Sequence, residues 1–175
     1  MKKIIFILAI IFYIPVSYSD TNIAYVDLNK LINESLVGKS LNKQIDSFEK
    51  NNYEKFKLVE IDLKSQEELI VSKRNIISDD EFKKEVNILR KKFNEYNNER
   101  KLFENNFKKV KIKYTQEILN LLNPVLTSYI DENSISLLFD KNELVIGKKN
   151  LDITNQILIL LNNKVKHIDF KYEKL

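Results

Sequence analysis

The chain has 175 residues and a net charge of +4, and it contains no cysteine, two glycines, two prolines and one histidine. The lack of cysteine excludes disulfides and thiolate chemistry, and so small a net charge does not indicate nucleic-acid binding. The scarcity of glycine and proline predicts long regular elements with few loops, and the length predicts one domain.

The first nineteen residues have the features of a secretory signal peptide. Two lysines give a positive start, an apolar run follows from Ile4 to Val16, and Ser17-Tyr18-Ser19 places small residues where a signal peptidase reads them. We therefore expect cleavage between Ser19 and Asp20. The alternative is an uncleaved anchor, which is less favoured because the run is shorter than the roughly 20 residues that span a bilayer.

The next segment predicts a short strand followed by helix. The run from Ile23 to Asp27 is apolar on both faces, which is typical of a buried strand, and Asp27 is placed to cap a short helix over Leu28–Asn33. Gly38 is expected to interrupt the chain before a first long helix over Lys39–Ile77, whose apolar spacing is helical but irregular.

A second and more regular helical pattern extends from Phe82 to Leu121. Its spacing alternates between four and three residues, which averages 3.5 and keeps one apolar stripe on a partner helix, as in a coiled coil. The stripe consists of twelve positions, of which ten are apolar or aromatic: 82, 86, 89, 93, 96, 100, 103, 107, 110, 114, 117 and 121.

A helix-start signal separates these two patterns. In Ser78-Asp79-Asp80-Glu81 the serine is placed to accept from the Glu81 amide, and the acidic residues favour the positive end of the helix dipole. So short a connection predicts that the two helices are antiparallel neighbours. Ile76 and Ile77 would then lie at the exposed tip of a helical hairpin.

The C-terminal third predicts a small body. Pro124 is expected to kink the second helix around Asn120–Asn123, and the helix is expected to resume and to end near Glu132-Asn133. Ile135–Phe139 and Leu144–Ile146 predict a β-hairpin, and Asp152 is placed to cap a helix over Ile153–Asn162. The tail from 164 to 175 looks frayed, although Ile168 and Phe170 are candidates for packing.

Together these elements predict an α+β fold that is mostly α. A long antiparallel helical hairpin (38–123, with its tip near 76–81) would be inserted in a three-stranded β body formed by 20–37 and 124–163, with a tail over 164–175. So small a sheet with apolar residues on both faces predicts oligomerisation through the body. The candidate contact residues are Ile23, Tyr25, Val26, Ile135, Leu137, Phe139 and Val145.

The sequence shows no catalytic, metal or cofactor constellation, so we expect a protein that is not an enzyme. His167 lies in a charged tail, and Asp27 and Asp140, which follow strands, are best interpreted as capping or turn residues. The second arm has 11 basic and 6 acidic residues against 8 and 9 in the first. Most of these charges fit a solvated coiled-coil face.

The order of features resembles the Skp/OmpH family of periplasmic chaperones. The resemblance rests on Ile23–Asp27, Asn33-Glu34-Ser35, Gly38-Lys39, Ile135–Asp140 and Leu151–Thr154, which flank the charged hairpin. It implies a homotrimer whose arms surround a cavity. It also implies a periplasmic, ATP-independent holdase without cofactors that binds unfolded outer-membrane proteins.

The arms are less basic than in strongly cationic members of that family, so at most weak contact with anionic membranes is expected, and no nucleic-acid partner. The candidate client-contact residues at the tip are Ile76 and Ile77. The alternative is a structural or adaptor coiled coil of the cell envelope, which would bind one defined partner through that tip.

Overall fold

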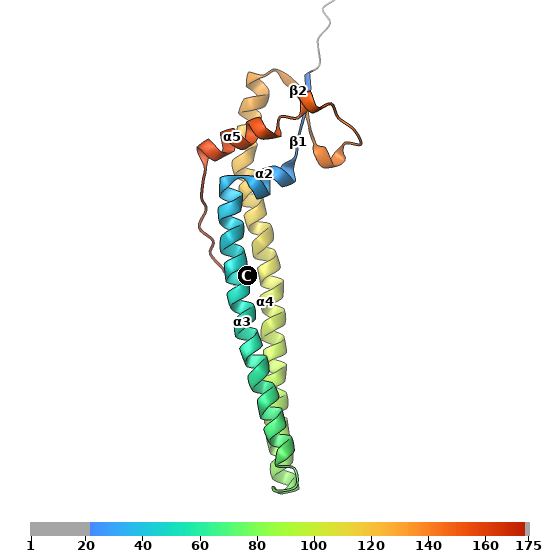
Figure 1. Ribbon diagram of the computed structural model, residues 1–175, viewed down its shortest axis with the longest axis vertical. Coiled ribbons are helices and arrows are strands. Elements are labelled where there is room, and N and C mark those ends of the chain that lie inside the picture. The colour runs from blue at the N-terminus through green and yellow to red at the C-terminus, as the bar shows by residue number, and fades with distance from the viewer. Residues whose placement is uncertain (1–21, 174–175) are drawn as a thin grey trace, which may run out of the picture.

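The computed structural model describes residues 22–173, so the predicted signal peptide and its Ser19–Asp20 cleavage site lie outside the described residues. Two long helices, α3 (Leu36–Ser72) and α4 (Asp79–Glu132), form an antiparallel rod with a small body at one end (Figure 1). The predicted helical hairpin is therefore confirmed. The body elements are β1 (Asn22–Val26), α2 (Leu28–Glu34), β2 (Ile135–Asp140) and α5 (Thr154–Lys164).

Within residues 22–173 the sheet has two strands, and the prediction of a third was wrong. β1 and β2 are parallel, with Ile23 opposite Leu137 and Tyr25 opposite Phe139. Parallel strands need a long crossover, and the whole α3–α4 hairpin provides it. The segment 144–146 forms no strand, and its Val145 and Ile146 side chains are 104% and 91% exposed.

The residues after β2 form a turn and an ion pair with the start of α2 instead of the predicted β-hairpin. A 3₁₀ turn, Lys141–Glu143, follows the strand directly, and the Lys141 ammonium pairs with the Asp27 carboxylate at 3.1 Å. The other side of β1 is covered by the segment before α5, where Asp152 forms a parallel bridge with Tyr25. A second 3₁₀ turn, Lys149–Leu151, leads into that bridge.

Gly38 lies in the first turn of α3 and does not interrupt the chain, contrary to the sequence-based expectation. Ser35 is the N-cap, and its hydroxyl accepts from the Gly38 amide at 3.1 Å. A Cβ on Gly38 would lie 1.8 Å from the carbonyl oxygen of Ile32, so only glycine lets α2 and α3 approach this closely. At its other end α3 stops at Ser72, five residues before the predicted end.

α4 begins and ends near the predicted positions. Ser78 is its N-cap and accepts from the Glu81 amide at 3.3 Å, as the helix-start signal predicted. The helix continues through Pro124 as a single element of 54 residues, which corresponds to about 80 Å. It ends where Ser134 adopts a positive φ of 51°, a conformation that stops a helix.

The buried residues form two clusters. The body cluster joins β1, α2, α5 and the adjoining ends of α3 and α4, and it contains Ala24, Val26, Leu31, Val37, Leu122, Val125, Ile153, Ile157 and Leu161. The arm cluster lies between α3 and α4 in the half of the hairpin nearest the body. It contains Leu41, Ile45, Phe103, Phe107, Val110, Tyr114 and Ile118.

The buried side of α4 drifts from the predicted 3.5-residue stripe. Tyr96, Phe103, Phe107, Val110 and Tyr114 are buried as expected, but Arg100 is exposed. Nearer the body, burial moves from the predicted positions 117 and 121 to 118 and 122. A straight helix has 3.6 residues per turn, so a strict heptad stripe leaves the interface after several turns.

None of the described helices combines the length and hydropathy needed to cross a bilayer.

Candidate functional site

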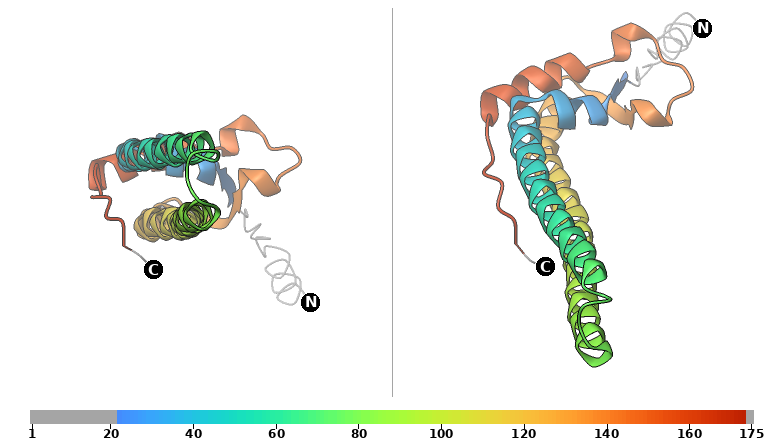
Figure 2. Two further views of the ribbon diagram at one scale, coloured as in Figure 1. Left: turned by 90° about the horizontal axis from the view of Figure 1, so that it is seen from below. Right: turned by 60° about the horizontal axis from the view of Figure 1, so that its bottom comes forward.

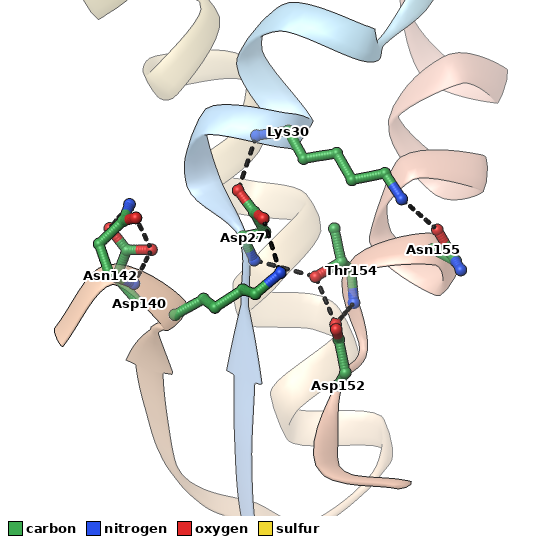
Figure 3. A network of polar contacts seen from close by, with 8 residues as sticks. Asp27, Lys30, Asp140, Asn142, Asp152, Thr154 and Asn155 are labelled. Atoms are coloured by element: carbon green, nitrogen blue, oxygen red, sulfur yellow. Dashed lines mark hydrogen bonds and ion pairs between the residues drawn. The ribbon is translucent and has the colours of Figure 1, made fainter. Parts of the chain in front are cut away.

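A network of polar contacts ties the two chain ends together in the body (Figure 3). The Asp27 amide donates to Thr154 Oγ1 at 2.9 Å, and the Thr154 amide donates to Asp152 Oδ1 at 2.9 Å. The Asp27 carboxylate caps α2 by accepting from the Lys30 amide at 2.9 Å, and Lys30 Nζ donates to Asn155 Oδ1 at 3.2 Å. The network therefore joins the end of β1 and the start of α2 to the start of α5, through contacts between residues 125 and 127 positions apart.

The carboxylates of this network have structural partners. The pKa of Asp27 is lowered, first because the Lys30 amide donates to it and then because Lys141 pairs with it, and the same ion pair raises the pKa of Lys141. Asp140 accepts from the Asn142 amide at 3.3 Å and caps the following turn. The interpretation of Asp27 and Asp140 as capping residues is confirmed. Across residues 22–173 no group of three potential metal ligands occurs.

The tip of the hairpin presents an apolar side chain on a braced turn. Ile76 is 81% exposed, whereas Ile77 is half-buried. The turn is braced by an ion pair of 3.0 Å between Arg74 and Asp79, and the Arg74 guanidinium lies 4.4 Å from the centre of the Phe82 ring. Both residues proposed for client contact therefore lie at the tip, but only Ile76 projects fully into solvent.

The half of the arm nearest the tip has a thin core. Leu63, Ile70 and Tyr96 are buried there, and between the helices lies an open cleft of about 390 Å³. The cleft is lined by apolar and charged side chains from both helices, and Phe93 on its wall is 50% exposed. Its lining is Glu60, Leu63, Lys64, Glu67, Val86, Leu89, Arg90 and Phe93.

Further apolar side chains lie on the outer surface of the arm. On α3 and α4 these side chains are between 44% and 68% exposed, which is far more than a closed two-helix core would leave. Where such side chains lie next to one another along a helix, as Leu58 and Ile61 do at a spacing of three, they offer apolar contacts to a partner. The residues are Leu58, Val59, Ile61, Leu69, Val71, Ile88, Leu102 and Ile112.

Residues 165–173 follow α5 and run back along one side of the arm (Figures 1 and 2), a course that the sequence did not predict. We call this segment the tail. Its Phe170 ring lies 5.2 Å from the centre of the Phe48 ring and 5.3 Å from that of Tyr114. Tyr172 lies 4.8 Å from Phe48 and 5.9 Å from Phe103. The signal that could have revealed it is the alternation of apolar residues at 168, 170 and 172.

Side chains of the arm hydrogen-bond the backbone of the tail. Gln44 donates to the Ile168 carbonyl at 2.8 Å and accepts from the Phe170 amide at 3.0 Å. The Tyr114 hydroxyl accepts from the Lys171 amide at 2.6 Å and lies 3.2 Å from the Asp169 carbonyl oxygen, to which it donates. The expectation of a frayed tail was therefore wrong for residues 165–173, whereas the expected packing of Ile168 and Phe170 is confirmed.

His167 also has defined partners rather than solvent alone. Its ring lies 2.6 Å from the Ser40 hydroxyl and 2.8 Å from the Asp169 carboxylate. Both contacts are exposed. The contact with Ser40 holds the start of the tail against α3, and the contact with Asp169 lies within the tail. This geometry gives His167 a positional role rather than a catalytic one.

The residues predicted to join protomers fall into two groups. Tyr25 and Val26 are buried within the chain itself, at 8% and 2% exposure. Ile135 is half-buried in the body, where it packs against the body cluster. The others remain accessible on the body surface, and they are Ile23, Leu137, Phe139 and Val145.

Comparison with known proteins gives a family and a fold. The model of the family described as outer membrane protein (OmpH-like) matches residues 22–161. The crystal structure of a "putative outer membrane chaperone (OmpH-like)" from Caulobacter crescentus CB15 has a TM-score of 0.81 and 18% sequence identity. The match covers 88% of this chain and 91% of that chain, and at this identity it establishes the fold alone. No curated protein matches the chain.

Proposed function

Because the chain belongs to the OmpH-like outer membrane protein family, we propose that it is a chaperone. It would act in the periplasm as an ATP-independent holdase that binds unfolded outer-membrane proteins and prevents their aggregation. The observation that carries this proposal is the arm, where apolar side chains outside the buried arm cluster line an open cleft and lie exposed on the outer surface. Such a surface offers many weak contacts to a chain without fixed structure.

We further propose that the protein is a homotrimer assembled through the body. The support is the apolar side chains left accessible on one small sheet, among them Leu137 at 50% and Phe139 at 37% exposure. A two-stranded sheet is rarely stable alone, and pairing with other copies would cover these side chains. Three arms acting on one client would also turn weak contacts into a high avidity.

The basic surplus of the second arm supports at most weak contact with anionic membranes. The alternative, an adaptor with one defined partner at the tip, is less well supported, because exposed apolar residues continue along the arm far from Ile76. Binding that depends on Ile76 alone would favour the adaptor. Binding distributed over the arm would favour the holdase.

The test is light scattering of an unfolded outer-membrane β-barrel protein diluted from urea, with and without the purified chain from residue 20 to 175 and without nucleotide. We expect the chain to suppress the scattering at near-stoichiometric amounts. The same preparation in multi-angle light scattering should have the mass of a trimer, and Leu137→Asp should convert it to a smaller species. A monomeric chain that leaves the scattering unchanged would refute both parts.

A further inference from the structure

The tail lies in a groove whose wall is built from both helices of the arm. α3 contributes Gln44 and Phe48, and α4 contributes Phe103 and Tyr114. Beyond Tyr172 the groove continues as a cleft of about 310 Å³. The cleft lies next to Tyr172 and is lined by residues of both helices, so the surface that holds the tail continues along the arm beyond the residues that the tail contacts up to position 173.

The tail meets this groove with every second side chain. Ile168, Phe170 and Tyr172 are half-buried against the arm cluster, whereas Asp169, Lys171 and Glu173 are exposed. A period of two is the property of an extended chain, whose successive side chains point to opposite sides. The groove thus accepts an extended segment that has apolar or aromatic residues at alternate positions.

The groove also binds the backbone of the tail in a way that does not depend on sequence. The amide group of Gln44 satisfies one carbonyl and one amide of the tail, and the Tyr114 hydroxyl does the same one step further along. Backbone hydrogen bonds combined with pockets for alternate side chains are the usual means of recognising an extended peptide.

We propose that this groove is a client-binding site for strand-forming segments of unfolded outer-membrane β-barrel proteins, and that the tail occupies it in the absence of client. Membrane-spanning strands of such barrels alternate apolar and polar residues and carry aromatic residues near both interfaces, which is the pattern the groove accepts. This inference rests on the proposed function. It adds the place where clients bind, the class of client segment that binds there, and the tail as an intramolecular competitor.

The competition has a predictable size. A segment tethered by a short linker experiences an effective concentration of order 1 mM. If the free tail binds the groove with a dissociation constant of about 0.1 mM, it occupies the groove about nine-tenths of the time, and its release strengthens client binding about tenfold.

The first experiment uses the unmodified chain. Hydrogen exchange of the Phe170 and Lys171 amides, which Gln44 and Tyr114 hold, is measured before and after adding an excess of a synthetic peptide with the sequence of residues 163–175. We expect both amides to lose protection as the peptide displaces the tail, while amides of the body cluster keep theirs. Unchanged protection of both amides at saturating peptide would overturn the proposal.

The second experiment compares tail variants of the full chain by fluorescence anisotropy with the same peptide carrying fluorescein. The double change Phe170→Ser and Tyr172→Ser should raise the affinity about tenfold. The matched control, Lys166→Ser and Lys171→Ser, changes exposed side chains and should leave the affinity unchanged. Adding Gln44→Ala to the variant with Phe170→Ser and Tyr172→Ser should weaken peptide binding again. An unfolded outer-membrane β-barrel protein should compete with the peptide for the groove.

The outcomes separate this proposal from the proposed function. If tail release changes neither peptide affinity nor client competition while the chain still suppresses aggregation, the groove is not a client site and the holdase function stands. If the chain neither binds the peptide nor suppresses aggregation, the proposed function fails as well. Should the double variant lose helical signal in circular dichroism, the exchange experiment on the unmodified chain decides.

Discussion

Gly38→Ala provides a test of how the arm is joined to the body. In an ordinary helix interior this change stabilises a protein by about 1 kcal/mol, because alanine has the higher helix propensity. Here the new Cβ would lie 1.8 Å from the Ile32 carbonyl oxygen and 3.0 Å from Ser35 Oγ. Because the first of these atoms is backbone, α2 and α3 would have to move apart.

The expected magnitude follows from the contacts that this movement disturbs. Overpacking a tight contact costs about 1 to 3 kcal/mol, and loss of the Ser35 cap costs about 1 kcal/mol more. After the gain in helix propensity of about 1 kcal/mol, we expect a net loss of about 2 kcal/mol in the free energy of unfolding. The movement would also strain the 2.7 Å bond from the Leu36 amide to Asn162.

The assay is urea unfolding followed by circular dichroism at 222 nm, at one protein concentration because the stability of the proposed trimer would depend on concentration. The control is Ser47, an exposed position of the same helix. The free energy of unfolding of Ser47→Ala should exceed that of Ser47→Gly by about 1 kcal/mol. If Gly38→Ala proves as stable as the unmodified chain or more so, the close approach of α2 and α3 is refuted.

Three further predictions concern the body core, its ion pair and the tip. Leu122→Ala leaves a cavity at a fully buried position and should lower the free energy of unfolding by about 2 to 5 kcal/mol in the same urea assay. Its control is Leu102→Ala, at a position 61% exposed, which should change that free energy by less than about 0.5 kcal/mol. The folded-state pKa of Asp27 is lowered, so its contribution to stability is complete above its unfolded pKa of about 3.9 and is lost as the pH falls through the lower folded-state pKa. Melting curves from pH 7 to pH 3 should therefore show less acid destabilisation for Asp27→Asn, and equal slopes would contradict the hydrogen bond from the Lys30 amide and the pairing with Lys141. Ile76→Asp should leave the melting temperature unchanged but weaken suppression of aggregation in the light-scattering assay. Unchanged suppression would show that the tip does not contact clients.

Local signals were enough to predict the arm. The capping residue Ser78 and the apolar spacing on either side of it determine two antiparallel helices, because caps and helical periodicity act over a few residues. The capping roles of Asp27 and Asp140 were predictable for the same reason. The family resemblance was also visible in the terminal motifs, and the match over residues 22–161 confirms it.

Only the tertiary structure decided how the chain ends are arranged. The pairing of β1 with β2, the exposed segment at Val145 and the close approach at Gly38 depend on residues that meet across elements rather than along the sequence. The tail is the clearest case, because Gln44 binds backbone groups 124 and 126 residues away. The sequence alone determined that the chain forms a helical hairpin, and long-range packing decided which surfaces of that hairpin are covered, since no local pattern records which distant segment lies against them.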